Sequence, residues 1–225
     1  MSAPAAIRVA DLTHRHRGAA APTLRDVSFD VPAGAGAAVV GESGAGKTTL
    51  LRCLAGLDRC ERGMIAIGDL RVDGANGAWD GLRGRVGMVF QTFELFPHLT
   101  VLENCVLAPV EVRRLPRAQA EEDARGWLLQ LGLGDKAGAY PSQLSGGQCQ
   151  RSAIARALAM SPACLLYDEP TSALDPARKG EVAEVLGDLR AAGMTQIVVT
   201  HDAAFLTTVA DLVFTLRRGR LERTR

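Results

Sequence analysis

The chain has no long apolar run, no paired cysteine motif and no excess of charge of one sign. No apolar stretch approaches the roughly 18 residues that a membrane-spanning helix needs. The first residues, MSAPAA, also lack the basic segment and the long apolar core of a signal peptide. We therefore expect a soluble chain that reaches a membrane only through a partner.

The cysteine pattern argues against two further kinds of site. Five cysteines make an odd count, and no two of them form a C-x-x-C pair. Such a pattern is typical of buried or half-buried thiols in a reducing compartment, and it favours neither a disulfide framework nor a zinc site. The formal net charge of +1 argues neither for nor against a nucleic-acid partner. The cysteines are Cys53, Cys60, Cys105, Cys149 and Cys164.

A glycine-rich stretch at residues 41–49, the phosphate loop, carries the strongest signal. Its sequence GESGAGKTT matches G-x-x-x-x-G-K-[S/T], the loop that cradles nucleotide phosphates. An apolar run at 37–40 predicts a buried strand before it, and leucines at helical spacing predict a helix over 47–57 after it. In this context Lys47 can reach the β- and γ-phosphates, and the Thr48 hydroxyl can ligate Mg²⁺. The predicted binding residues of the loop are Gly41, Glu42, Ser43, Gly44, Ala45, Gly46, Lys47, Thr48 and Thr49.

Strand and helix patterns alternate on both sides of a helical stretch. Glycines predict loop and turn over 68–84. The pattern predicts one α/β domain over 1–225, with a nucleotide-binding core at 1–91 and 161–225 and a helical insert at 92–160. The predicted strands span 7–13, 27–31, 37–40, 64–67, 86–90, 163–167, 197–200 and 212–216. The predicted helices span 47–57, 100–112, 117–131, 145–160 and 176–192.

Two carboxylates follow a predicted buried strand. Asp168 and Glu169 come directly after the apolar residues 163–167. In nucleotide-binding sheets of this kind, the ligand lies beyond the carboxyl ends of the strands. Asp168 is therefore positioned to hold Mg²⁺, usually through water. Glu169 can orient and deprotonate the attacking water.

A second anion site is predicted at the start of the helix over 145–160. Ser145 stands at its N-cap, and Gly146 and Gly147 before Gln148 expose backbone amides. A chain with one phosphate loop has no evident use for this second site within itself. In a two-fold dimer, each chain's second site can close on the γ-phosphate that the other chain holds.

Together with Gln91, Asp175 and His201, these motifs resemble the full motif set of the ATP-binding subunit of ABC transporters, in the same order and over nearly the whole chain. The resemblance implies a P-loop ATPase core of the ABC type, with an inserted helical subdomain and an N-terminal antiparallel β region. It implies that Gln91 senses Mg²⁺ and the transport partner, and that Asp175 links the two sites across the dimer. It also implies that His201 contacts the γ-phosphate and steadies the attacking water, so that Mg-ATP is hydrolysed.

Residues 93–104 and 167–176 are similar to those of polar-amino-acid importers. This similarity implies that closure of the dimer around ATP drives import. The implied partners are a second ATPase subunit, in a homodimer, transmembrane permease subunits that contact the chain near Phe93–His98, and indirectly a substrate-binding protein, with no nucleic acid. The implied place is the cytoplasmic face of the bacterial inner membrane. Two alternatives stay open: an ABC ATPase of the lipoprotein-export or cell-division type, and a soluble ABC ATPase without a transport role.

Two residues depart from the family pattern. His16 stands where the family usually has an aromatic residue that stacks on adenine. Imidazole offers a smaller stacking surface, so we expect adenine to be held more loosely. Cys149 stands where glutamine is common just after the family's signature, the motif at residues 144–148, and we expect it to pack rather than react.

Overall fold

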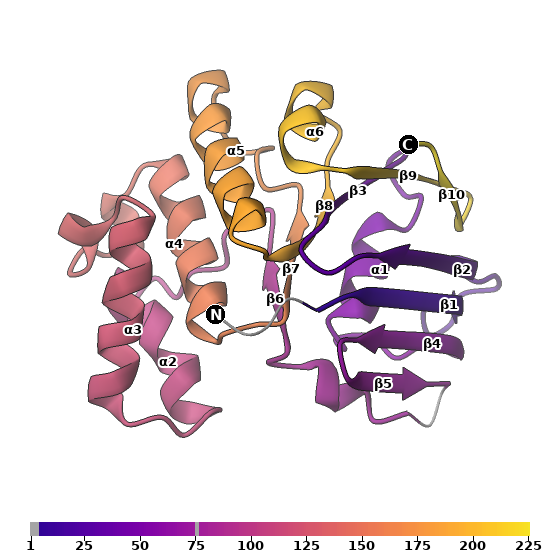
Figure 1. The fold of residues 1–225 in the computed structure, drawn as a ribbon, viewed down its shortest axis with the longest axis horizontal. Helices are drawn as coiled ribbons and strands as arrows, with labels where there is room; N and C mark the ends of the chain where they lie inside the picture. The colour runs from indigo at the N-terminus through magenta and orange to yellow at the C-terminus, as the bar shows by residue number, and fades with distance from the viewer. Residues whose placement is uncertain (1–4, 75–76) are drawn as a thin grey trace.

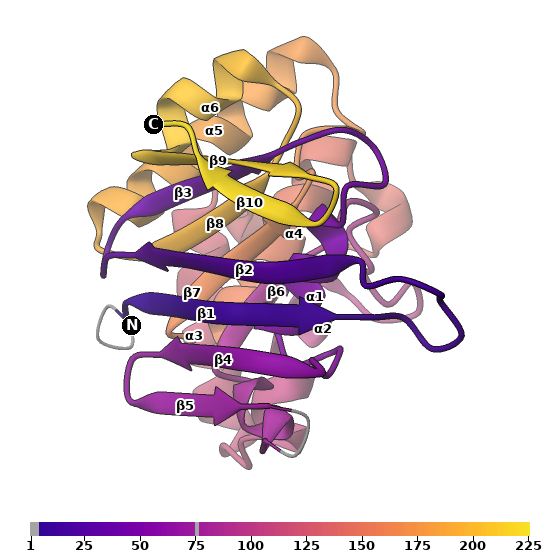
Figure 2. The ribbon, with the colours of Figure 1, turned by 90° about the vertical axis from the view of Figure 1, so that its right-hand side faces the viewer.

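A six-stranded sheet runs through the middle of the molecule, and helix α1 (Lys47–Leu54) lies between this sheet and a second, four-stranded sheet (Figures 1 and 2). The computed structural model describes residues 5–74 and 77–225. The six-stranded sheet has the order β10 (Arg220–Arg223), β9 (Leu212–Arg217), β3 (Gly36–Val40), β8 (Thr195–Val199), β7 (Cys164–Asp168) and β6 (Val86–Val89). The four-stranded antiparallel sheet has the order β2 (Leu24–Val31), β1 (Ile7–His14), β4 (Arg62–Ile67) and β5 (Leu70–Asp73).

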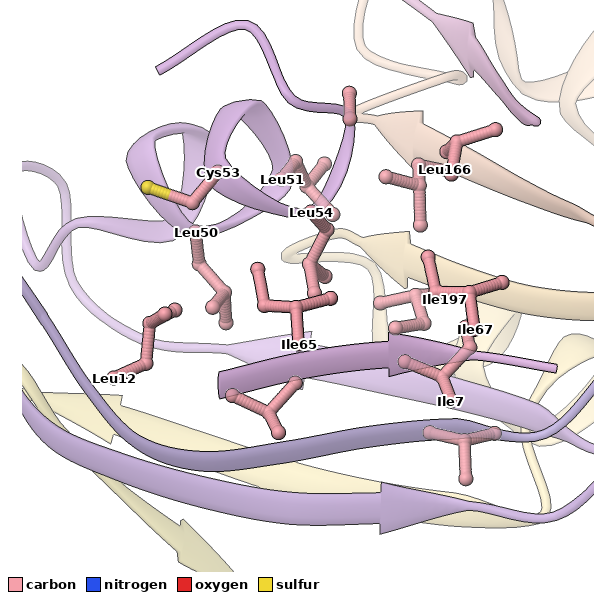
Figure 3. Packing of buried hydrophobic residues seen from close by; sticks show 14 of the residues in the cluster. Ile7, Leu12, Leu50, Leu51, Cys53, Leu54, Ile65, Ile67, Leu166 and Ile197 are labelled. Atoms are coloured by element: carbon pink, nitrogen blue, oxygen red, sulfur yellow. The ribbon is translucent and has the colours of Figure 1, made fainter. Parts of the chain in front are cut away.

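The strands from β9 to β6 are parallel, so their carboxyl ends share one edge of the sheet. Successive residues of a strand point to opposite faces, and the apolar strand β7 therefore serves two parts of the core. Leu166 joins the cluster around α1, whereas Leu165 and Tyr167 join the cluster under the helices on the other face. Figure 3 shows the first cluster, in which Leu50 and other α1 side chains pack toward β1 and β4.

The helices other than α1 lie on the opposite side of the six-stranded sheet (Figure 1). The helices of the predicted insert, α2 (Val101–Glu111), α3 (Arg117–Gln130) and α4 (Gly146–Ala159), gather at one end of the molecule. The helices of the core on this side are α5 (Pro176–Ala191) and α6 (Ala203–Val209). Short 3₁₀ turns lie at Trp79–Leu82, Gly134–Lys136 and Pro141–Gln143. This arrangement of sheets and helices confirms the predicted fold class.

The predicted helix over 47–57 was too long. Helix α1 ends at Leu54, because Gly56 takes a left-handed φ of 69° that turns the chain. The N–H of Leu57 then donates to the carbonyl of Arg52 at 2.9 Å, and the N–H of Gly56 donates to the carbonyl of Cys53 at 3.0 Å. These two bonds satisfy the last carbonyls of the helix.

The prediction of loop and turn over 68–84 was wrong in part. Residues 70–73 form β5, in which Val72 is buried and pairs with Ile65 of β4. Trp79 begins a 3₁₀ turn, is fully buried and donates from its indole nitrogen to the carbonyl of Gly74 at 2.9 Å. Short apolar segments between glycines are weak signals by themselves, and here the neighbouring strand β4 decides their structure.

The described residues include no helix that combines the length and the apolar character needed to cross a bilayer.

Candidate active site

The phosphate loop connects the end of β3 to the first residue of α1. At Gly41 a Cβ atom would lie 2.3 Å from the carbonyl oxygen of Leu216, so only glycine fits there. Gly46 caps α1 with a φ of 105°, a conformation that glycine adopts without strain. The loop therefore delivers the chain directly into a helix N-terminus, where unpaired backbone amides attract anions.

Lys47 lies inside this loop. The residue is only 6% exposed. Its Nζ atom donates to the carbonyls of Gly41 at 2.8 Å and Glu42 at 3.0 Å. The ammonium group is thus held by backbone oxygens at the centre of the loop. It can exchange these carbonyls for phosphate oxygens without leaving its position.

Asp168 and Thr48 bring a carboxylate and a hydroxyl together beside the loop. Asp168 ends β7 and is 8% exposed. Burial raises the pKa of Asp168, a hydrogen bond with Thr48 opposes this rise, and the charge of Glu169 adds to it. A carboxylate and a hydroxyl are ligands that Mg²⁺ prefers. Burial and the charge of Glu169 both disfavour the ionised form of Asp168, and a bound cation would stabilise that form. These residues therefore fit a magnesium ion.

Gln91 follows β6 by two residues and is exposed. Because β6 and β7 are parallel neighbours, with Val89 opposite Tyr167, Gln91 comes at the same edge of the sheet as Asp168. The structure therefore places the three residues predicted to bind metal, Thr48, Gln91 and Asp168, at the carboxyl ends of adjacent strands or on the helix that follows the loop.

Glu169 has an unusual backbone conformation. Its φ is 48°, a value that costs a non-glycine residue roughly 1–3 kcal/mol. Its N–H donates to the carbonyl of Val199 at 2.9 Å, and its carbonyl accepts from the N–H of Ser172 at 3.1 Å and from the Ser172 hydroxyl at 3.0 Å. The surrounding strands and turn thus hold this carboxylate in place.

His201 completes this edge of the site. It follows β8 by two residues, and its Nε2 atom lies 3.2 Å from Oε1 of Glu169. The imidazole is about half exposed, at 51%, whereas the Glu169 side chain is 27% exposed. The predicted base and the predicted histidine are therefore in direct contact, in an open depression of about 240 Å³ that Thr171 and Ser172 also line.

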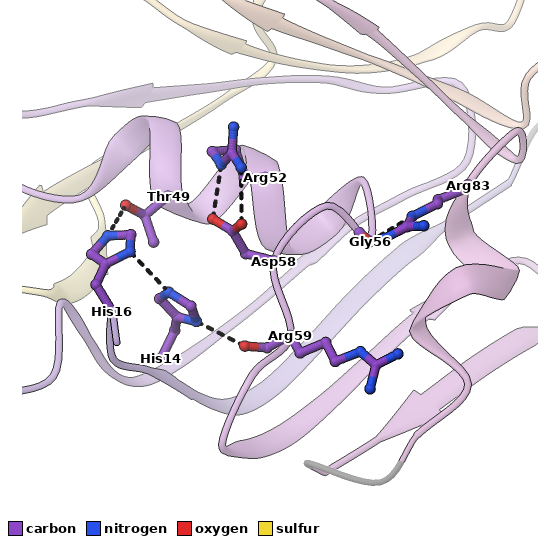
Figure 4. Close-up of polar contacts among 8 residues, drawn as sticks. All are labelled: His14, His16, Thr49, Arg52, Gly56, Asp58, Arg59 and Arg83. Carbon is purple, nitrogen blue, oxygen red and sulfur yellow. Dashed lines mark hydrogen bonds and ion pairs between the residues drawn. The ribbon is translucent and has the colours of Figure 1, made fainter. Parts of the chain in front are cut away.

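His16 lies near the other side of the loop. Its Nε2 atom is 3.2 Å from the hydroxyl oxygen of Thr49, in the first turn of α1 (Figure 4). The imidazole is exposed. The structure therefore brings the residue predicted to stack on adenine next to the phosphate loop, although the two are separated by β2 and β3 in the sequence.

The signature residues form a separate group. Ser145 caps α4: its hydroxyl accepts from the N–H of Gln148 at 3.3 Å, and the Gln148 side chain accepts from the N–H of Ser145 at 2.9 Å. Gly146 and Gly147 lie against Leu174 and Arg178, respectively, so the start of α4 packs beside the start of α5. This packing brings the signature close to the segment that carries Asp175.

Asp175 is itself the N-cap of α5. Its Oδ1 atom accepts from the N–H of Arg178 at 3.1 Å, and its Oδ2 atom forms an ion pair with the Arg178 guanidinium at 3.2 Å. Figure 1 places α4 and α1 on opposite sides of the six-stranded sheet. One chain therefore does not bring Ser145 and Lys47 together.

Asn104 is a residue that the sequence analysis missed. It lies on α2, is 1% exposed, and its Oδ1 atom accepts from the N–H of Phe96 at 2.8 Å. Its Nδ2 atom donates to the carbonyls of Phe96 at 3.2 Å, Leu99 at 3.1 Å and Thr100 at 2.9 Å. Asn104 thus holds the loop that was predicted to receive the permease. An amide on the buried face of an amphipathic helix was the available signal.

The fold and this site define an ATPase of the ATP-binding cassette type. The family model described as ABC transporter matches residues 24–172, and the chain belongs to this family. An ATP-binding cassette solved as a dimer in a post-hydrolysis state, bound to ADP and Pi, superposes with a TM-score of 0.83 at 31% identity, over 97% of this chain and 99% of that one. The predicted family and the predicted ATP-hydrolysing activity are confirmed.

Two relatives indicate the branch of the family. The glutamine transport ATP-binding protein GlnQ of Geobacillus stearothermophilus is 46% identical over 88% of this chain and 82% of its own length. The general L-amino acid transport ATP-binding protein AapP of Rhizobium johnstonii is 45% identical over 88% of this chain and 77% of its own length. The chain therefore aligns with most of the length of both relatives, and each relative is named for amino-acid transport.

Proposed function

We propose that this ATPase powers the import of a polar amino acid. The observation that carries the proposal is the high identity, over most of both chains, to proteins named for amino-acid transport. We further propose that the chain is a single ABC ATPase domain, with the core at 1–91 and 161–225 and a signature-bearing insert at 92–160. In this proposal the chain works at the cytoplasmic face of the bacterial inner membrane.

The residues of the phosphate loop bind the nucleotide. Its amides and Lys47 hold the β- and γ-phosphates, and His16 stacks on the adenine. Thr48 and Asp168, with Gln91, hold Mg²⁺, which supplies positive charge beside the phosphates when bound. Since Lys47 already lies at the centre of the loop, bound to the carbonyl of Gly41 at 2.8 Å, it can stabilise the charge that develops in the transition state.

Glu169 accepts the proton of the attacking water. Its backbone is fixed by Val199 and Ser172, and its carboxylate contacts His201 at 3.2 Å. His201 in turn steadies the carboxylate and contacts the γ-phosphate. This pairing supports a role for the two side chains in the same step, in which the carboxylate takes the proton and the imidazole orients the water.

Two copies of the chain share each nucleotide in the proposed mechanism. Ser145, Gly146, Gly147 and Gln148 of one copy close on the γ-phosphate bound by the other, and Asp175 lies at the seam between them. The capped start of α4, distant from α1 in the same chain, supports this arrangement. Association then follows ATP binding by mass action.

The closing dimer moves two permease subunits, which receive substrate from a binding protein. The contact surface is the loop Phe93–His98, where Phe96 is 43% exposed. Phe93 and Leu95 pack against the helical cluster instead. The loop thus presents the Phe96 ring, beside the exposed ring of His98, from a backbone that Asn104 and Arg156 hold, as a docking surface requires.

The experiment is to isolate the chain with its membrane subunits and reconstitute the complex in lipid. We expect permease subunits to co-purify, and we expect ATP hydrolysis to rise when a binding protein loaded with a polar amino acid is added. A complex that carries Lys47→Ala should assemble without this response. Amino-acid import would be excluded if membrane subunits of lipoprotein export or cell division co-purified instead. It would also be excluded if no loaded binding protein changed the rate of ATP hydrolysis.

A further inference from the structure

A cluster of metal-ligating side chains lies between the end of β1 and the turn after α1. One ring nitrogen of His14 and the sulfur atoms of Cys53 and Cys60 lie within 4.8 Å of one another. All three residues are buried, with exposed fractions of 6%, 0% and 1%. A second group shares His14, since His14, His16 and a carboxylate oxygen of Asp58 also lie within 4.8 Å of one another.

The fold brings these residues together although they are far apart in the sequence. After α1 the chain turns at Gly56 and returns to β1, where the N–H of Glu61 donates to the carbonyl of Thr13 at 2.9 Å. This bond fixes Cys60 beside His14. Cys53 comes from the last turns of α1, and Figure 3 shows its sulfur pointing away from the leucines of that helix. No local spacing in the sequence could reveal such a cluster.

Hydrogen bonds orient the His14 ring for a ligand. Its Nδ1 atom lies 2.9 Å from the carbonyl oxygen of Arg59 (Figure 4), so this nitrogen carries the proton and donates it. The lone pair is then on Nε2. Histidines that bind metals are typically held by such a bond on the other ring nitrogen.

Two further side chains near His14, those of His16 and Asp58, are candidates for an additional ligand. Nε2 of His14 lies 3.4 Å from Nδ1 of His16, which is long for a nitrogen–nitrogen hydrogen bond and is easily replaced. Asp58, by contrast, accepts two bonds from the Arg52 guanidinium, at 2.8 and 3.0 Å. Its charge is already compensated, so the carboxylate is a poorer ligand here than the second imidazole.

We propose that Cys53, Cys60 and His14 bind a zinc ion, with His16 as the fourth ligand. Two thiolates and two imidazoles are a tetrahedral donor set that Zn²⁺ takes in structural sites. Ligand atoms of such a centre lie roughly 3.3–3.8 Å apart, because the Zn–N and Zn–S distances are about 2.0 and 2.3 Å. The facing ring nitrogens of His14 and His16 lie 3.4 Å apart, which matches this spacing. The ligand atoms of His14, Cys53 and Cys60 lie within 4.8 Å of one another and would move closer together around the ion.

The site would join β1 to the turn between α1 and β4. His16 is exposed, so the ion can enter from this side while the other three ligands stay buried. A zinc ion that takes His16 also fixes the ring predicted to stack on adenine, and it should therefore change the affinity for ATP. That consequence rests on the proposed nucleotide site, whereas zinc binding itself does not.

The test uses the full chain without a histidine tag, reduced and freed of metal, and titrated with Co²⁺ as a probe for zinc. We expect one cobalt ion per chain, with the intense visible and near-ultraviolet absorption of tetrahedral cobalt thiolate, and we expect Zn²⁺ to displace it. Zinc at one equivalent should also raise the Tm. Cys60→Ser and Cys53→Ser should each abolish the thiolate absorption and the rise in Tm.

Cys105→Ser is the matched control, because Cys105 is equally buried but lies on α2, outside the cluster. This variant should keep the cobalt spectrum, and circular dichroism should show that every variant is folded. His16→Tyr should keep the thiolate absorption but bind more weakly. Absence of the thiolate bands in the parent chain, their persistence in Cys60→Ser, or a disulfide between Cys53 and Cys60 under reducing conditions would each overturn the proposal.

Discussion

The backbone of Glu169, at the carboxyl edge of the sheet, is held by contacts that do not depend on its own side chain. Glu169 keeps its φ of 48° through the carbonyl of Val199 and through the N–H and hydroxyl of Ser172. In the part of the chain that the structure describes, the carboxylate adds the contact with His201 at 3.2 Å. Its chemistry can therefore be changed with little effect on the backbone, which makes this residue suitable for an isosteric substitution.

Glu169→Gln should keep ATP binding and remove most of the hydrolysis. A positioned general base contributes about 10²- to 10⁴-fold to a rate, so we expect turnover to fall by at least about 100-fold. Steady-state phosphate release and equilibrium nucleotide binding would measure the two effects. Glu122→Gln, on the exposed face of α3, is the control and should hydrolyse ATP like the parent. Turnover by Glu169→Gln at the parent rate would refute the assignment of Glu169 as the base.

At the scale of single residues, the sequence predicted that Lys47 and Asp168 lie at the nucleotide edge of the sheet, but not how their neighbours are held. The strand, loop and helix around Lys47 and the position of Asp168 after a buried strand followed from motif and periodicity. The positive φ of Glu169 and the proximity of His14 to Cys60 did not. Both depend on neighbours that are distant in the sequence, such as Val199 and the turn after α1.

Among the elements, helix α2 does more than pack against its neighbours. Its Asn104 side chain makes hydrogen bonds to Phe96, Leu99 and Thr100, and Arg156 of α4 donates to the carbonyl of Phe93 at 3.0 Å. Phe93 and Glu94 both have positive φ values, of 61° and 51°. The loop before α2 is therefore a strained segment that is held by two side chains from helices.

Asn104→Ala should destabilise the chain and loosen this loop. Truncation leaves the N–H of Phe96 and several carbonyls without their buried partner, at a cost of about 2–3 kcal/mol in the free energy of unfolding. Urea unfolding would measure this change, and hydrogen exchange should show faster exchange at the Phe96 amide. Gln119→Ala, on the exposed face of α3, should change the free energy by less than about 0.5 kcal/mol. A loss of stability without faster exchange at Phe96 would contradict the role in the loop.

Element boundaries show where periodicity stops being informative. The long helices α3, α4 and α5 lie within a few residues of their predicted ranges, since their apolar positions repeat over several turns. Strand β5 escaped prediction because it has four residues and only Val72 of them is buried. Its pairing with β4, not its own pattern, makes it a strand.

The fold separates the two helix starts that are predicted to bind anions. The phosphate loop precedes α1 on one side of the six-stranded sheet, and Ser145 caps α4 on the other side. Because the six-stranded sheet lies between them, the start of α1 and the start of α4 do not meet within one chain. If both act on one phosphate, the second must come from another copy, and a two-fold dimer then holds two nucleotides.

Ser145→Arg should therefore leave ATP binding intact and abolish ATP-dependent dimerisation. The bulky cation would occupy the space where the γ-phosphate of the partner copy is expected. Light scattering after size exclusion, in the Glu169→Gln background with Mg-ATP, would measure the mass. The background dimer should become monomeric with the added substitution, while the dissociation constant of the monomer for ATP stays close to that of the parent.

The control must separate this effect from the loss of a helix cap, which costs about 1 kcal/mol. Thr100→Arg provides it, because Thr100 caps α2 with the same reciprocal pattern: its hydroxyl accepts from the N–H of Glu103 at 3.2 Å, and the Glu103 carboxylate accepts from the N–H of Thr100 at 2.8 Å. This variant should lose similar stability and still dimerise with ATP. If both substitutions abolish the dimer, the damage lies in the helical region, and if neither does, the start of α4 does not contact the partner's nucleotide.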